Sequence, residues 1–245
     1  MANWSDPRMV GAPPAAVGAG TRDVAYDAGL RSYMLSVYNY MASGILLTGV
    51  VALLFAKTEI AQSIILGGGI LRWVLMFSPL IFVMIMGVGM NRMSTRALQV
   101  CFWAFATVMG LSMSSIFFRF SGGSIAQTFF ATSAAFAGLS LWGYTTKKDL
   151  SGFGTFLIMG AVGLLVASFI NVFMQSTALY WAISSIGVLI FAGLTAYDTQ
   201  KIKSMYSYVA GTDMMGKTII MGALNLYLDF VNMFQFLLSF LGSRD

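Results

Sequence analysis

Residues 153–173 read FGTFLIMGAVGLLVASFINVF, a run of 21 residues without a charged side chain. An α-helix rises 1.5 Å per residue, so such a run covers about 30 Å, which is the thickness of the hydrocarbon core of a bilayer. The sequence therefore predicts a membrane span here. Six further apolar runs of similar length predict six more spans, at 34–56, 73–90, 97–118, 125–144, 179–197 and 219–241.

The composition and the pattern within the runs predict helices. The chain is 58% apolar and only 9% charged, whereas about one quarter of the residues in a soluble domain are charged. Lipid offers no water to backbone groups, which leaves α-helices or closed β-barrels as spanning structures. Barrel strands would alternate apolar and polar residues, and these runs do not. We expect an all-α, seven-helix membrane bundle formed by residues 32–245, preceded by a flexible cytosolic tail at residues 1–31.

The distribution of charged residues predicts the orientation in the membrane. Cytosolic loops of membrane proteins carry an excess of Lys and Arg. If the loops alternate sides, ten of the 14 basic residues lie on the side of the N-terminus and four on the other. We therefore expect a cytosolic N-terminus and a periplasmic C-terminus. The ten are Arg8, Arg22, Arg31, Arg92, Arg96, Lys147, Lys148, Lys201, Lys203 and Lys217, and the four are Lys57, Arg72, Arg119 and Arg244.

Several chemistries are disfavoured by residues that the sequence lacks. Cys101 is the single cysteine, so neither a disulfide nor a cysteine metal site is expected. The chain has no histidine, so a response near neutral pH must use other groups. The basic residues form no stripe with interleaved aromatic residues, which argues against nucleic acid as a partner. We expect the lipid bilayer as the surroundings and no tightly bound cofactor.

Asp229 is the acidic residue that a membrane helix least tolerates. It lies ten residues beyond Ile219, or about 15 Å into the bilayer. An ionised carboxylate there costs at least about 2.5 kcal/mol, so Asp229 should face the interior, find a partner or take up a proton. Asn225, Asn232 and Gln235 share its helix face and are candidates for lining a path. The alternative is that this polar stripe only hydrogen-bonds one helix to another.

Asp198 is ambiguous from its position alone. It ends the sixth apolar run, where a carboxylate could simply lie among lipid headgroups. If it met Asp229, the two groups could not both ionise cheaply and would titrate as a coupled pair, a pH sensor without histidine. Arg92 at the end of the second run would then be an available counter-charge. Carboxylate oxygens also suit Ca²⁺, but two aspartates favour transient passage over storage.

Three segments of the chain read GYTTKKDLS at 143–151, AYDTQK at 196–201 and GALNLYLDF at 222–230. Together they resemble the bacterial branch of the Bax inhibitor (transmembrane Bax inhibitor motif) family. The similarity extends from about residue 31 onward. It implies seven spans with the last helix surrounded by the other six, and a pH-dependent calcium leak in the bacterial inner membrane. It further implies that Asp198 and Asp229 are a di-aspartyl pH sensor, and that Arg92 is its arginine latch, with Arg96 as the alternative.

The sequence also allows two other classes of function. Some relatives that resemble this chain are associated with a membrane-bound quality-control protease, and the N-terminal tail would be a natural handle for such a partner. An intramembrane aspartyl protease would also use two aspartates. That enzyme family, however, carries Gly-x-Gly-Asp where residues 226–229 read LYLD, and a later proline, whereas no proline follows Pro79. We therefore expect no enzymatic activity.

Overall fold

The computed structural model describes the backbone of residues 15–243 and the side chains of residues 24–243. Within that range the chain is helical and contains no strand. Seven helices are long and apolar enough to cross a membrane, which confirms the prediction of an all-α membrane bundle. The helices are α1 (Ala15–Ala56), α2 (Glu59–Leu66), α3 (Ile70–Gly89), α4 (Thr95–Met113), the 3₁₀ turn η1 (Ser114–Phe118), α5 (Gly122–Thr145), α6 (Ser151–Met174), α7 (Thr177–Val209) and α8 (Met214–Leu241).

Two helices extend well beyond the apolar runs that predicted them. Helix α1 begins at Ala15, so residues 15–31 of the predicted tail are helical, as their alanine content favours. Residues 1–14 lie outside the described residues. Helix α7 continues past residue 197 to Val209, because Lys201 and Lys203 end the apolar run without ending the helix. A charged residue marks the end of the segment that can lie in the hydrocarbon core, but lysine is a good helix former and allows the helix to continue.

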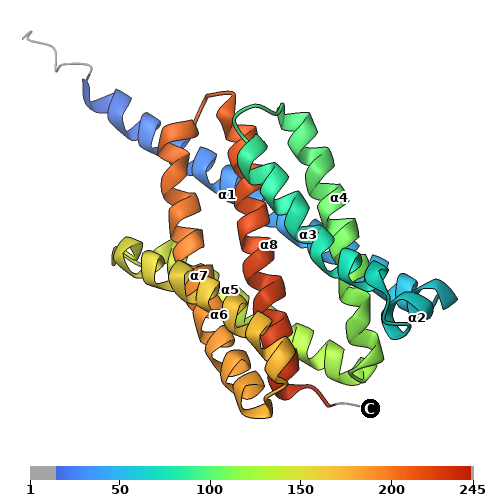
Figure 1. The fold of residues 1–245 in the computed structure, drawn as a ribbon. Helices are drawn as coiled ribbons and strands as arrows, with labels where there is room; N and C mark the ends of the chain where they lie inside the picture. Colours follow the sequence, from blue (N-terminus) through green and yellow to red (C-terminus); the bar gives the residue numbers. More distant parts are fainter. Residues whose placement is uncertain (1–14, 244–245) are drawn as a thin grey trace, which may run out of the picture.

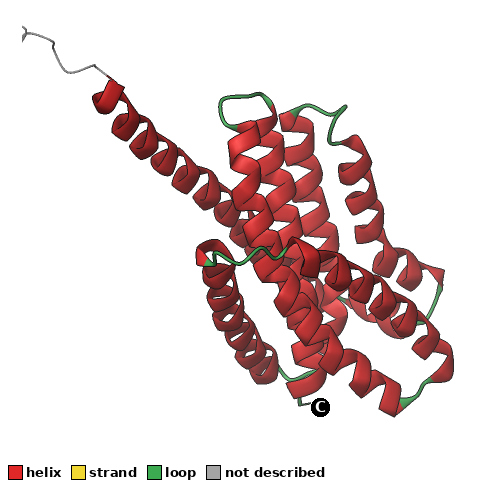
Figure 2. Cartoon of the chain, turned by 90° about the vertical axis from the view of Figure 1, so that its left-hand side faces the viewer, coloured by secondary structure: helices red, strands yellow, loops and turns green. Residues whose placement is uncertain are grey.

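Helix α8 lies at the centre of the bundle (Figure 1). It packs against α1, α4, α5 and α7, whereas α3 packs on α4, and α6 packs on α7. Half of the most apolar stretch of α8 is buried in the protein, against 11% for α3 and for α6. The last helix is therefore central, as expected, but the other six spans do not all contact it. Four of them pack closely on α8, and α3 and α6 flank these four. The turned view in Figure 2 shows the short loops that join these helices.

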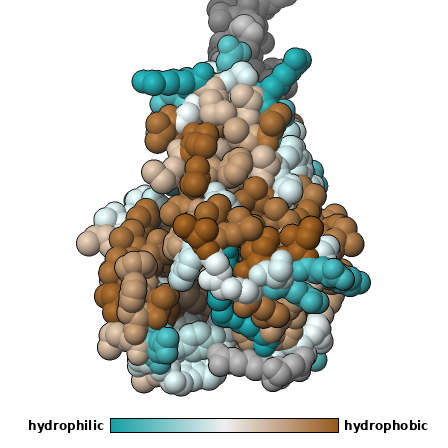
Figure 3. Space-filling view, turned by 45° about the vertical axis from the view of Figure 1, so that its right-hand side comes forward, coloured by the Kyte–Doolittle hydropathy of each residue, from teal (hydrophilic) through white to brown (hydrophobic). Residues whose placement is uncertain are grey.

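The outer surface is suited to lipid. Brown apolar side chains cover the middle of the face in Figure 3, and teal polar side chains lie above and below them. On the flanking helices large apolar residues are exposed, such as Val88 at 80% and Phe173 at 74%. In water an apolar surface of this extent would drive association, so these side chains are explained by burial in a bilayer.

A glycine sets the distance between α5 and α7. Gly143 is buried, and a Cβ atom added to it would collide with the backbone carbonyl of Ala196. Since small residues let membrane helices approach closely, Gly143 brings α5 against the part of α7 that carries Asp198. The first two motifs, 143–151 and 196–201, thus meet in space.

Candidate functional site

Asp229 lies near the middle of α8, in the interior of the bundle. Its side chain is only 4% exposed, and its neighbours on the helix, Tyr227 and Phe230, are buried as well. Among the described residues, no donor reaches the carboxylate oxygen Oδ2. A buried carboxylate oxygen without a donor is unfavourable in general, which favours a protonated or cation-bound form of this group.

Asp198 of α7 supplies the group that faces Asp229. The two carboxyl groups lie within side-chain hydrogen-bonding reach of each other, between two helices that pack together along their length. Neither group donates a hydrogen when both are ionised, so a bond between them requires that one carry a proton. The structure thereby brings together the two aspartates that the family resemblance paired and that spacing alone left apart.

The structure does not bring Arg92 to this pair. Arg92 and Arg96 are exposed around the turn between α3 and α4, and within residues 24–243 neither forms an ion pair with an acidic side chain. Helix α3 packs on α4 rather than on α7, and α7 does not end at Asp198 but continues to Val209. The cation whose field acts on Asp198 is Lys201, nearly one turn later on the same helix.

The three amides of the predicted polar stripe are half-buried along α8. The side chain of Asn232 donates to the carbonyl of Leu228 at 2.8 Å, a bond within its own helix. Among the described residues, none of the hydrogen bonds made by Asn225, Asn232 or Gln235 joins α8 to another helix. The described hydrogen bonds therefore give no support to the alternative that this stripe bonds one helix to another, and the role of the three amides in lining a path stays a prediction.

Two hydroxyl networks were missed at the level of sequence. Thr48 of α1 donates to the carbonyl of Ala106 at 2.8 Å and pairs with the hydroxyl of Tyr227 at 2.7 Å, which joins α1, α4 and α8. The signal for Tyr227 was its place in the motif 222–230, two residues before Asp229. The network fixes the rotation of α8 about its axis, and hence the direction in which Asp229 points.

The second network joins α1, α5 and α7. Ser140 pairs with the hydroxyl of Tyr38 at 2.9 Å and with that of Thr199 at 2.8 Å. Thr199 is fully buried and follows Asp198 directly. Only the motif AYDTQK pointed to Thr199, whereas Tyr38 and Ser140 lie in apolar runs that carry no such signal.

Gln200 fastens the loop between α5 and α6 to α7. Its amide oxygen accepts from the backbone N–H of Leu150 at 2.9 Å, and its amide nitrogen donates to the carbonyl of Lys148 at 2.8 Å. In the same loop, hydrogen bonds from the side chain and backbone of Ser151 lower the pKa of Asp149 below its ordinary value of 3.8. Asp149 is fully exposed and stays ionised at neutral pH.

The pair of aspartates is too small to be a resident metal site by itself. Within the side chains described, no group of three or more His, Cys, Asp or Glu could hold a metal ion. Ca²⁺ takes six to eight oxygen ligands in general. A calcium ion beside Asp198 and Asp229 would therefore need amide, carbonyl or water oxygens to complete its shell.

Comparison with known proteins places this arrangement in a family. The family model described as inhibitor of apoptosis-promoting Bax1 matches residues 30–245. The protein RP147 of Rickettsia prowazekii is 44% identical over 225 residues, 91% of this chain and 94% of that protein. Inner membrane protein YbhL of Escherichia coli K12 is 41% identical over 219 residues, 89% of this chain and 94% of that protein. Three motifs, seven spans and these matches agree, and the chain belongs to the Bax inhibitor family.

Proposed function

We propose that this protein is a pH-dependent leak path for Ca²⁺, gated by protonation of the pair Asp198 and Asp229. One observation carries the proposal: two carboxyl groups face each other inside the bundle, between α7 and the central helix α8. Carboxyl groups so placed share a proton at low pH and repel each other once both are ionised. The pair therefore couples the proton concentration to the packing of α7 on α8.

Ca²⁺ is the cargo that the oxygen groups of the site support. Two ionised carboxylates attract a divalent cation, and hard cations prefer oxygen ligands. The half-buried amides of Asn225, Asn232 and Gln235 continue along α8 on both sides of Asp229. These side chains would line the path, and Asp198 and Asp229 would bind Ca²⁺ only in passing.

The test is calcium flux into vesicles that contain the purified protein and a trapped calcium dye. Asparagine has the shape of a protonated aspartate and no charge. The variant Asp229→Asn should therefore show, from about pH 6 to about pH 8, the flux that wild type shows at the acid end of this range. A wild-type flux that does not change with pH, or an Asp229→Asn profile that still follows wild type, would exclude this gate.

The matched control is Asp149→Asn. The pKa of Asp149 is lowered by its bonds to Ser151, so its carboxylate stays ionised throughout the tested range. Its replacement removes one aspartate charge from the same protein without removing a group that titrates there. We expect the calcium flux of Asp149→Asn to depend on pH as in wild type. A flux that no longer depends on pH in Asp229→Asn can then be assigned to the buried pair.

We keep Arg92 as the proposed latch in a second state of the protein. In the structure the turn between α3 and α4 leaves Arg92 exposed, so latching requires this turn to move toward α7. Arg92→Gln should then alter the pH profile of the flux, whereas Arg96→Gln should not. If Lys201→Gln alters the profile and Arg92→Gln does not, the counter-charge of Asp198 is Lys201.

We further propose a bacterial inner membrane location with the N-terminus in the cytoplasm and the C-terminus in the periplasm. The ratio of basic residues supports this orientation. A fluorescent protein that folds only in the cytoplasm, fused after residue 245, should stay dark, and alkaline phosphatase fused at the same place should be active. The opposite result would reverse the orientation. We propose no enzymatic activity and no tightly bound cofactor.

One observation favours a second role, as a regulator of a membrane-bound quality-control protease. The N-terminal part of α1 extends beyond the other helices (Figures 1 and 2), and residues 24–28 are exposed. A projecting terminal segment is accessible to a partner. Deletion of residues 1–26 should then abolish co-purification with the protease and leave the calcium flux intact, and unchanged co-purification would refute this role.

A further inference from the structure

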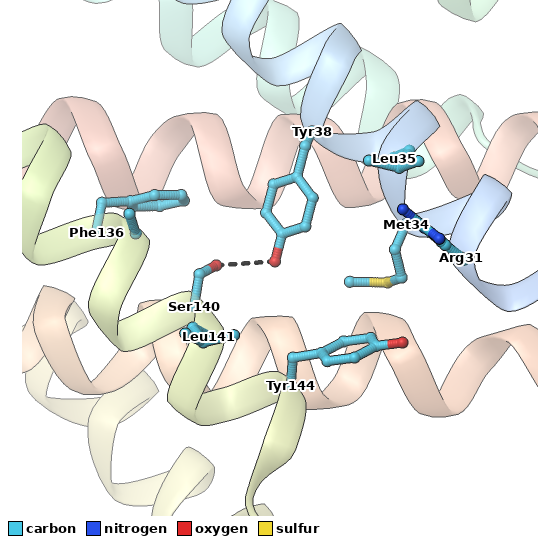
Figure 4. Close-up of a pocket in the computed structure, with 9 residues that line it drawn as sticks. Arg31, Met34, Leu35, Tyr38, Phe136, Ser140, Leu141 and Tyr144 are labelled. Atoms are coloured by element: carbon cyan, nitrogen blue, oxygen red, sulfur yellow. Dashed lines mark hydrogen bonds between the residues drawn. The ribbon is translucent and has the colours of Figure 1, made fainter.

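A groove of about 510 Å³ lies between α1 and α5, within the range of small-ligand sites. The two helices pack mainly on α4, α7 and α8 rather than on each other, which leaves the space between them open. The hydrogen bond between Tyr38 and Ser140 crosses the groove (Figure 4). The lining residues are Arg31, Met34, Leu35 and Tyr38 from α1, and Phe136, Ala137, Ser140, Leu141 and Tyr144 from α5.

The groove is positively charged at one end and apolar along its length. Figure 4 shows Arg31 and Tyr144 toward one end and Phe136 at the other. Arg31 is exposed, and it forms no ion pair with an acidic side chain in residues 24–243, although Asp27 precedes it by about one turn. The ammonium group of Lys203 lies 4.5 Å from the ring centre of Tyr144 and donates to its carbonyl at 2.8 Å.

We propose that this groove binds one anionic phospholipid of the leaflet on the side of the α1 N-terminus. The phosphate lies at Arg31, near the second positive charge of Lys203, and one acyl chain follows Met34, Leu35 and Leu141 toward Phe136. Charge selects this occupant: the cationic headgroup of a zwitterionic lipid would oppose Arg31 and Lys203, whereas an anionic headgroup complements both. The groove belongs to helices that span the membrane, so lipid is the molecule that reaches it.

This lipid would touch the helices that hold the aspartate pair. Ser140 pairs both with Tyr38 in the groove and with Thr199, the residue that follows Asp198. The lipid site therefore contacts one end of the network that joins α1, α5 and α7. Binding at the groove does not depend on the calcium leak, and either proposal can fail without the other.

Native mass spectrometry of the detergent-purified protein tests the site. The probes are phosphatidylglycerol and phosphatidylcholine with identical acyl chains, added at equal concentration. One cation near the membrane surface favours an anionic lipid by about fivefold. We expect the first bound lipid to be phosphatidylglycerol by at least about this ratio in wild type, and the preference to fall by about fivefold in Arg31→Gln.

Three further variants separate the groove from general lipid contact. Arg31→Lys keeps the charge and should keep the preference. Arg96→Gln removes another exposed arginine, which lies outside the groove, and should also keep the preference. Ala137 is exposed on the groove wall, and Ala137→Trp should fill the groove and weaken the first binding event for both lipids. Equal binding of the two lipids by wild type, an undiminished preference in Arg31→Gln, or unchanged binding in Ala137→Trp would each overturn the proposal.

Discussion

The hydroxyl of Tyr227 illustrates how a single residue orients the central helix. Thr48 gives its own hydrogen to the carbonyl of Ala106, so the hydroxyl of Tyr227 is the donor in the bond between them. Tyr227 and Thr48 are both buried. A substitution that leaves a buried polar group without its partner costs more stability than one that removes the polar group itself. Replacing the donor and replacing the acceptor of this bond should therefore have different effects on stability.

We expect Thr48→Val to destabilise the protein more than Tyr227→Phe does. The valine leaves the tyrosine hydroxyl without its acceptor, at about 1–3 kcal/mol, and also removes the second bond to the carbonyl of Ala106, which keeps its bond within α4. The phenylalanine removes the donor itself and leaves Thr48 bonded to Ala106, at about 1 kcal/mol. Thermal unfolding in detergent measures both. The control is Thr145→Val, because Thr145 is exposed and its side-chain hydrogen bonds lie within α5. A lower unfolding temperature for Tyr227→Phe than for Thr48→Val would contradict the assigned donor.

At the scale of the helices, the apolar runs predicted the existence and the number of the spans, because the thickness of the bilayer fixes the length of helix that must be apolar. They did not predict the extension of α7 to Val209 or the start of α1 at Ala15. These segments are held by helix propensity and packing outside the apolar stretch. The first charged residue after an apolar run therefore marks the end of the segment that lies in the hydrocarbon core, and the helix itself can continue beyond it.

The glycine contact between α5 and α7 gives a prediction at this scale. Gly143→Ala should destabilise the protein by about 1–3 kcal/mol, because its Cβ meets backbone at Ala196 and the two helices must move apart. Gly138→Ala on the same helix has open space around its Cβ and should be neutral or stabilising by up to about 1 kcal/mol, since alanine favours the helix. Thermal unfolding of both variants in detergent checks the pair. Equal effects would show that α5 does not approach α7 so closely.

For the whole molecule, the candidate site could be predicted only in part from the residues themselves. The cost of a midplane carboxylate singled out Asp229, but no spacing within one helix reveals which residue of another helix faces it. Asp198 came from the family resemblance, and the packing of α7 on α8 supplies the physical reason. The structure does not place Arg92 beside this pair, because Arg92 lies exposed in the turn after α3, and α3 packs on α4 rather than on α7, so its role as the latch stays a prediction.

Because the pair lies between the central helix and its most extensive contact, its charge should set the stability of the whole bundle. At low pH the two groups share at least one proton and bond to each other, and as the pH rises the second charge introduces repulsion between α7 and α8. Wild type should therefore lose thermal stability from about pH 5 to about pH 9. Asp229→Asn and Asp198→Asn should each lose much less over that range, because either change removes one of the two charges.

The double variant makes this prediction specific to the pair. Once one aspartate is neutral, no repulsion remains for the second substitution to relieve, so at high pH the gain in the double variant should fall well below the sum of the single gains. At low pH, where the wild-type pair is protonated, each Asn change should have little effect. Unfolding midpoints of the four proteins at both ends of the pH range measure the coupling. Additive gains at high pH would mean that each aspartate destabilises the bundle independently, and that repulsion between the two does not cause its pH response.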